Sequence, residues 1–173
     1  MKQQILLFLI GLFWMHPAFS QPIVIVQGSE DALAVKKQIM QYLDELDVRE
    51  NVHLSVSFTT LVSEYVKGMT FCLNSLASNT YQVIRVRIDA RLNKTQQRRV
   101  LAHEMIHVKQ FAKGELIVIN SQQVIWKGQK YWCVGGSRKS APWEDEAHQI
   151  DKILARLDKV QPEAPLAAAG KNR

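Results

Sequence analysis

The sequence predicts a single α+β domain, and three observations carry that prediction. Stretches that alternate apolar and polar residues, as half-buried strands do, are interspersed with stretches of helical spacing. The chain has 173 residues and is 47% hydrophobic, which is enough for one buried core. No internal repeat or second domain is visible. We therefore expect a mixed or antiparallel sheet of three to five short strands packed on two of the helices.

The first twenty residues predict a secretory signal peptide rather than part of the fold. Lys2 supplies the positive start, the apolar run 5–14 follows, and Ala18-Phe19-Ser20 offers a cleavage site. The alternative is an uncleaved anchor, but a ten-residue apolar run is too short to span a bilayer comfortably. We expect an exported protein, periplasmic or secreted, without a membrane span after cleavage.

The rest of the chain divides into a domain over 21–160 and a tail over 161–173 that we expect to be disordered. Export places Cys72 and Cys133 in an oxidising compartment, where one disulfide is feasible, although their spacing leaves the pairing open. The net charge of +6 is spread along the chain. No dense basic stripe suggests nucleic-acid binding, and we expect none.

The first predicted elements are a strand over 23–27 and a helix over 30–47. The strand is a short apolar run after Pro22. Residues 29–31 (Ser-Glu-Asp) provide a capping residue and two acids for the first helical turn. The apolar residues at helical spacing are Leu33, Ile39, Leu43 and Leu46.

Three strands are predicted next, over 53–58, 69–73 and 81–88. The last shows the clearest alternation in the chain, with Arg85 and Arg87 on the face opposite its apolar residues.

A second helix is predicted over 93–113, because its first residue is an asparagine and Gln96 completes a capping box. Gly114 ends it. A hairpin over 115–120 and 123–127 follows, and then a loop over 128–140.

The last predicted helix begins at residue 140 or 141 and continues to about residue 160. Pro142, Glu144 and Asp145 lie in its first turn, where proline and acids are favoured.

The second helix carries the sharpest chemical signal, His103-Glu104-Met105-Ile106-His107. Residues four apart share a helical face, so both imidazoles can reach one metal ion. Glu104 then lies where it can take a proton from a water on that metal. One face of the helix is apolar and the opposite face carries His103, His107 and Gln110. The apolar residues are Leu101, Met105, Val108 and Ala112.

The alternative is a surface helix with two incidental histidines. After signal removal only four histidines remain, His53, His103, His107 and His148, and three of them fall in or near the predicted site. The incidental interpretation is therefore the weaker one.

A catalytic zinc site needs a third protein ligand, and the segment 142–148 (Pro-Trp-Glu-Asp-Glu-Ala-His) offers candidates. A His-Glu-x-x-His helix followed by a helix beginning Pro-x-Glu-x-Glu-Ala resembles the small, minimal gluzincin metallopeptidases. The resemblance covers residues 100–148. It implies a zincin-like fold, a Zn²⁺ ion, and Glu144 as the third ligand.

Helical periodicity supports that choice only in part. Glu144, His148 and Asp151 form a polar row on the last helix, whereas Glu146 projects onto its apolar side. An acid on an apolar face is unusual and could itself be a ligand, so Glu146 stays the alternative to Glu144.

The chain departs from the gluzincin pattern at one position. Members often carry an aspartate four residues after the ligand glutamate, and here that residue is His148. His148 could bond the ligand set or an oxyanion, and Asp151 could supply the missing carboxylate. Tyr131 is a further oxyanion candidate.

The aromatic segment 126–132 between the two ligand helices is expected to pack within a hairpin, with the lining of a substrate groove as the alternative. The resemblance also implies that the strand over 81–88 borders the cleft and that a peptide could add to its edge. Arg98 and Arg99 are expected on a solvated helix face.

The sequence therefore predicts a monomeric, exported zinc metallopeptidase with ligands His103, His107 and Glu144 and with Glu104 as general base. Its substrate would be a peptide or protein, a cell-wall peptide among the candidates. The alternatives are a zinc-binding envelope protein without peptidase activity and an exported domain without metal.

Overall fold

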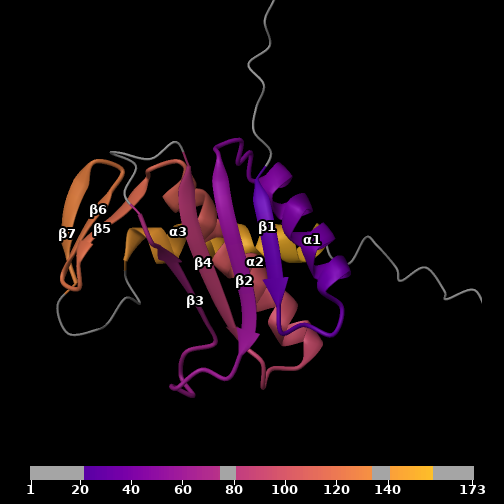
Figure 1. The fold of residues 1–173 in the computed structure, drawn as a ribbon. Helices are drawn as coiled ribbons and strands as arrows, with labels where there is room; N and C mark the ends of the chain where they lie inside the picture. The colour runs from indigo at the N-terminus through magenta and orange to yellow at the C-terminus, as the bar shows by residue number, and fades with distance from the viewer. Residues whose placement is uncertain (1–21, 75–80, 134–140, 158–173) are drawn as a thin grey trace, which may run out of the picture.

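The computed structural model describes residues 22–74, 81–133 and 141–157, and the chain folds as an α+β domain with three helices and two sheets (Figure 1). The predicted signal peptide (1–20) and the predicted tail (161–173) lie outside the described residues. The α+β class is confirmed. The prediction of one sheet with three to five strands is wrong, because seven strands form one sheet of four and another of three.

The larger sheet is mixed. It consists of β1 (Ile23–Gln27), β2 (Val52–Thr59), β3 (Gly68–Cys72) and β4 (Gln82–Asp89) in the order β1-β2-β4-β3. β1, β2 and β4 run parallel, whereas β3 runs antiparallel to β4. The strand expected to border the cleft, β4, is therefore interior. β3 pairs with the side of β4 that was expected to be free and becomes the edge strand itself.

Alternation along the two long strands defines the core face. Leu54 and Val56 of β2 and Ile84 and Val86 of β4 are fully or almost fully buried, in register with one another. Arg85 and its neighbour on the same face are exposed, as the alternation predicts. The helices cover the buried face (Figure 1).

Helix α1 (Ala32–Glu45) joins β1 to the parallel strand β2. Its N-cap is Asp31, whose carboxylate accepts a hydrogen bond from the backbone N–H of Ala34 at 3.0 Å. Glu30 and Asp31 were predicted in the first helical turn. They precede the helix instead, because Asp31 is its N-cap. Leu33, expected on the apolar face, is 81% exposed, since the buried stripe of the helix begins a turn and a half later, at Ile39.

Helix α2 (Lys94–Ala112) lies between the larger sheet and α3 (Pro142–Leu157), contacting β3 and β4 on one side and α3 on the other. The predicted capping box is present, with Asn93 and Gln96 bonding reciprocally at 2.9 and 3.1 Å. The helix ends before Gly114, which adopts φ 66°. None of the helices among residues 22–74, 81–133 and 141–157 is long and apolar enough to cross a bilayer.

The smaller sheet is an antiparallel meander of β5 (Leu116–Asn120), β6 (Gln123–Trp126) and β7 (Gln129–Trp132). The hairpin expected over 115–127 is confirmed, but the loop expected from residue 128 is wrong at its start. Lys127 and Gly128 both have positive φ, 45° and 82°, which suits the tight two-residue turn that joins twisted strands. A lysine in this turn replaces the usual asparagine or aspartate, so the sequence signal for β7 is weak.

Candidate metal centre

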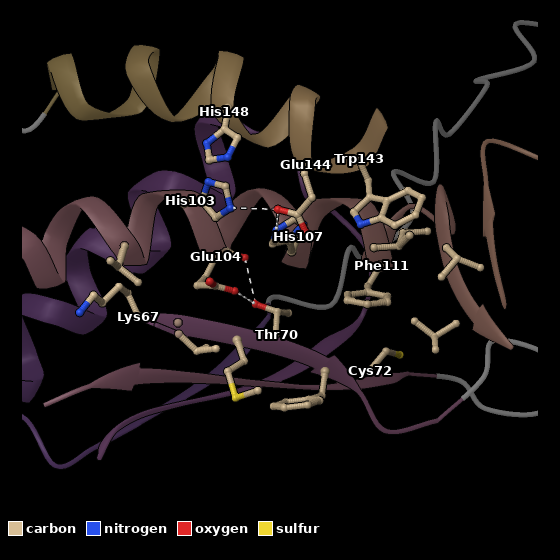
Figure 2. A pocket seen from close by; sticks show the side chains of 18 of the residues that line it. Lys67, Thr70, Cys72, His103, Glu104, His107, Phe111, Trp143, Glu144 and His148 are labelled. Carbon is tan, nitrogen blue, oxygen red and sulfur yellow. Dashed lines mark hydrogen bonds and ion pairs between the residues drawn. The ribbon is translucent and has the colours of Figure 1, made fainter. Parts of the chain in front are cut away.

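The predicted ligands His103, His107 and Glu144 come together where α2 and α3 lie side by side (Figure 2). Nε2 of His103 lies 3.5 Å from Oε2 of Glu144, and Nε2 of His107 lies 3.4 Å from the same oxygen. The three residues form a group that could hold a metal ion, and all three side chains are at least four-fifths buried.

The separations within this group fit a metal better than they fit direct ion pairs. Charge-assisted N–H···O bonds are typically about 2.7–2.9 Å long. Ligand atoms on a tetrahedral zinc ion, each about 2.1 Å from the metal, lie about 3.4 Å from one another. The two distances to Glu144 match the edge of such a tetrahedron. Two imidazoles and a carboxylate are also a donor set that zinc uses in catalytic sites.

The alternative third ligand, Glu146, lies elsewhere. Its carboxylate accepts hydrogen bonds from Gln110 at 2.8 Å and from Lys127 at 2.9 Å, and it lies 3.5 Å from Lys109. The structure therefore brings Glu144 to the histidines and ties Glu146 to two lysines and an amide. The apolar-face position that made Glu146 a candidate is explained by this network, which satisfies the carboxylate without a metal.

His103 has a carboxylate behind it. While Nε2 faces Glu144, Nδ1 lies 3.4 Å from Oδ2 of Asp151. Asp151 is 7% exposed, and it stands where a carboxylate can fix the tautomer and orientation of the ring. His148, whose side chain is 66% exposed, lies against His103 with ring centroids 4.7 Å apart and has Nδ1 3.7 Å from Asp151.

His107 has an amide behind it. Its Nδ1 lies 2.8 Å from Oε1 of Gln110, which is fully buried. The same Gln110 side chain donates to the carbonyl of Trp143 at 2.9 Å and to Glu146. The helical face expected to open on a cleft is therefore closed along this part, because α3 covers it.

The charges in the group reinforce one another. Burial opposes ionisation of Glu144, but the facing imidazoles of His103 and His107 outweigh it and hold the pKa of that carboxyl below its usual range. Burial also opposes charge on His107, and its contacts with Glu144 and Glu104 nonetheless raise its pKa. The site thus favours a carboxylate facing positive charge, and a cation that bound there would take the place of the imidazole protons as that charge.

Glu104 lies beside the ligands and faces β3. Its carboxylate accepts a hydrogen bond from the hydroxyl of Thr70 at 2.6 Å (Figure 2). The residue as a whole is only 5% exposed. Burial is the main cause that raises its pKa, which makes the carboxylate a better proton acceptor. Gly68 makes this approach feasible: a Cβ there would come within 2.5 Å of Glu104 Oε1 and 2.6 Å of Val100.

These groups line a cavity of about 850 Å³ between β3, α2, α3 and the smaller sheet. The aromatic residues Trp126, Tyr131 and Trp132 do not line it. Tyr131 donates its hydroxyl to Gln129 and packs edge-on against Trp143, so the structure does not bring it to the predicted oxyanion position. Cys72 and Cys133 both line the cavity as free thiols.

Three residues at the site were not identified from the sequence. Gln110 was placed on the face of the two histidines but given no role there, although it follows His107 by three residues, a spacing that could have revealed their contact. Arg99, expected on a solvated helix face, is exposed but lines the cavity. Thr70 is 34 residues from Glu104, and nothing local in the sequence signals their contact.

Comparison with protein-family models, with curated proteins and with solved structures finds no match for the chain.

Proposed function

We propose that this protein is an exported zinc-dependent metallopeptidase of minimal gluzincin type. The observation that carries the proposal is the grouping of His103, His107 and Glu144 at metal-ligand separations, with the buried carboxylate of Glu104 beside them. The zincin-like fold belongs to the proposal too. It is supported by the placement of the ligand helix α2 directly behind an antiparallel edge strand, β3.

The chemistry divides between a metal and the chain. A bound Zn²⁺ would polarise a carbonyl and lower the pKa of a water. Glu104 takes the proton of the attacking water as general base and delivers it to the amine that leaves when the peptide bond breaks. Thr70 holds the Glu104 carboxylate in place for this transfer. His148, exposed at the rim, is a candidate donor to a developing oxyanion.

The substrate we propose is an extended peptide or protein segment, a cell-wall peptide included. β3 pairs with β4 through one edge, and Lys67–Cys72 all line the cavity. A peptide that adds to β3 would therefore pass in front of Glu104. This replaces the strand over 81–88 as the docking edge.

The alternative is a zinc-binding envelope protein without peptidase activity. A closed structural site would need a fourth protein ligand and no base. Among the described residues, the group that contains Glu144 has three members, and Glu104 lies beside it bonded to Thr70. These observations favour the enzyme.

The metal assignment is tested by zinc stoichiometry of the purified domain, with Glu144→Ala beside Glu146→Ala. We expect one zinc per wild-type chain, retained in Glu146→Ala and lost or much weakened in Glu144→Ala. Absence of zinc from the wild type after metal is supplied would overturn the proposal.

The reaction is tested by Glu104→Gln, which keeps the ligands and removes the base. We expect full zinc content and a loss of peptide hydrolysis by at least about a hundredfold. Normal turnover by this variant would exclude Glu104 as the base.

A further inference from the structure

The cavity has two chemically different ends, separated by the candidate catalytic groups. Arg99 lies one helical turn before His103, and Phe111 lies one turn after His107, so the two residues mark opposite ends of the cavity along α2. Figure 2 shows Lys67 at one end, Phe111 and Trp143 at the other, and Glu104 between them.

The end near Arg99 is cationic. Lys67 and Arg99 both line the cavity and both are exposed. Lys67 donates to the backbone carbonyl of Glu64 at 3.0 Å. Within the part of the chain that the structure describes, neither cation forms an ion pair with a carboxylate. Their positive charge is therefore open to an anionic group that enters the cavity.

The opposite end is apolar. It is formed by α2, the start of α3 and the smaller sheet, and its side chains include no charged group. Its apolar residues are Phe111, Leu116, Val118, Val124 and Trp143, and the uncharged Asn120, Ser121 and Cys133 of the same region also line the cavity. All of the apolar residues except Val118 are at most 7% exposed, so this wall is well packed. Val118, which is 55% exposed, supplies most of its accessible apolar surface.

The direction of the edge strand β3 determines which part of a bound peptide would meet each end of the cavity. β3 runs from Gly68, beside Lys67, towards Cys72 at the apolar end. An added strand pairs best with an edge in the antiparallel sense, which would start at the apolar end and finish at the cationic end. A residue before the scissile bond would then meet the apolar wall, and one after it would meet the cations.

We propose that the cavity selects extended peptides with an apolar side chain before the scissile bond and a carboxylate after it. The carboxylate would be that of an acidic side chain or of the peptide's own C-terminus. This inference rests on the proposed peptidase function for the position of the scissile bond, but it concerns binding as well as turnover.

The test measures binding by calorimetry with the zinc-loaded Glu104→Gln protein, so that no peptide is cleaved. One peptide carries leucine before the central bond and glutamate after it. Its partners replace the glutamate with glutamine, replace the leucine with serine, or exchange the two residues. We expect the first peptide to bind about three- to tenfold more tightly than each partner at low salt. Its advantage over the glutamine peptide should shrink at high salt.

Matched variants locate the two ends. Arg99→Glu should abolish the preference for glutamate, whereas Arg98→Glu should keep it, because Arg98 is an exposed neighbour that does not line the cavity. Val118→Ser should weaken the preference for leucine, whereas Ile119→Ser should keep it, since Ile119 is similarly exposed but outside the cavity. All four positions are exposed, and each variant should unfold at the wild-type temperature.

Equal binding of all four peptides would overturn the inference, as would a preference that Arg98→Glu abolishes as completely as Arg99→Glu. Turnover of the same peptides by the wild type separates this result from the proposed function. Selective binding without hydrolysis would support the proposed binding preference and overturn the proposed peptidase function. Hydrolysis without selective binding would support the peptidase function and overturn the binding preference.

Discussion

The two histidines of α2 occupy matching positions one turn apart, yet the structure supports them in different ways. His107 is backed by a neutral amide, Gln110, within a buried network that reaches Trp143 and Glu146. His103 is backed by a carboxylate, Asp151, beside the exposed ring of His148. One candidate ligand is thus held by the packing of two helices, and the other by a buried acid beside an exposed ring. Stability and metal affinity should therefore divide between the two sides.

The largest expected effect is on the buried side. Gln110→Leu removes the partner of His107 and leaves the Trp143 carbonyl and Glu146 without an amide donor. We expect the free energy of unfolding of the zinc-free protein to fall by about 2–4 kcal/mol, measured by urea denaturation. Gln149→Leu, an exposed glutamine on α3, is the control and should change it little. A similar stability for both variants would show that the network is not structural.

The next effect is on the surface side and concerns the metal more than the fold. Asp151→Ala removes the carboxylate behind His103, and we expect zinc affinity to fall about 10- to 100-fold. Competition with a chromogenic chelator measures this. Asp145→Ala, in an exposed position of the same helix, should bind zinc as the wild type does. Unchanged affinity in Asp151→Ala would mean that His103 needs no such partner.

A third support lies outside the pair of histidines, at Glu104, the proposed general base. Thr70→Val keeps the shape of the side chain and removes the hydroxyl bonded to Glu104. We expect kcat to fall by about tenfold or more with little change in KM or zinc content. Thr70→Ser restores the hydroxyl and should recover most of the rate. Failure of that recovery would assign Thr70 a packing role only.

The smallest expected effect is the pH dependence of zinc affinity that His107 causes. Contacts with Glu144 and Glu104 outweigh burial and raise the pKa of His107, so a proton competes with a metal for this ring at higher pH than for an ordinary imidazole, near 6.5. The ring must be neutral to bind zinc, so affinity falls as pH falls through the raised pKa, by about tenfold per pH unit for each proton displaced. Zinc titrations at a series of pH values measure the slope. Affinity that stays constant as the pH falls to 6.5, the ordinary pKa of the ring, would contradict the raised pKa.

Sequence reasoning predicted the parts of this molecule that depend on local spacing. The capping box at Asn93, the i, i+4 pair of histidines and the alternation of β4 are all features of a few consecutive residues. The choice between Glu144 and Glu146 was different. Glu144 lies in the first turn of α3 and Glu146 only two residues later, and the lysines that hold Glu146 come from α2 and from the turn after β6.

What the sequence could not predict depends on pairing between distant segments. The edge position of β3 follows from its pairing with β4, and the Thr70–Glu104 bond follows from that position. Strand β7 was missed because a Lys-Gly turn carries little sequence signal even though its backbone adopts the required positive φ angles.

The absence of a side chain at Gly68 has a consequence for how such a protein can diversify. Gly68 and Thr70 lie on the same five-residue strand, where one gives Glu104 room and the other bonds it. The smaller sheet forms part of the apolar wall. The described hydrogen bond of the Glu104 side chain comes from Thr70 of β3, not from that sheet. Mutations in the meander β5–β7 can therefore change which ligands fit the cavity. The position of Glu104 would stay the same, because β3 sets it.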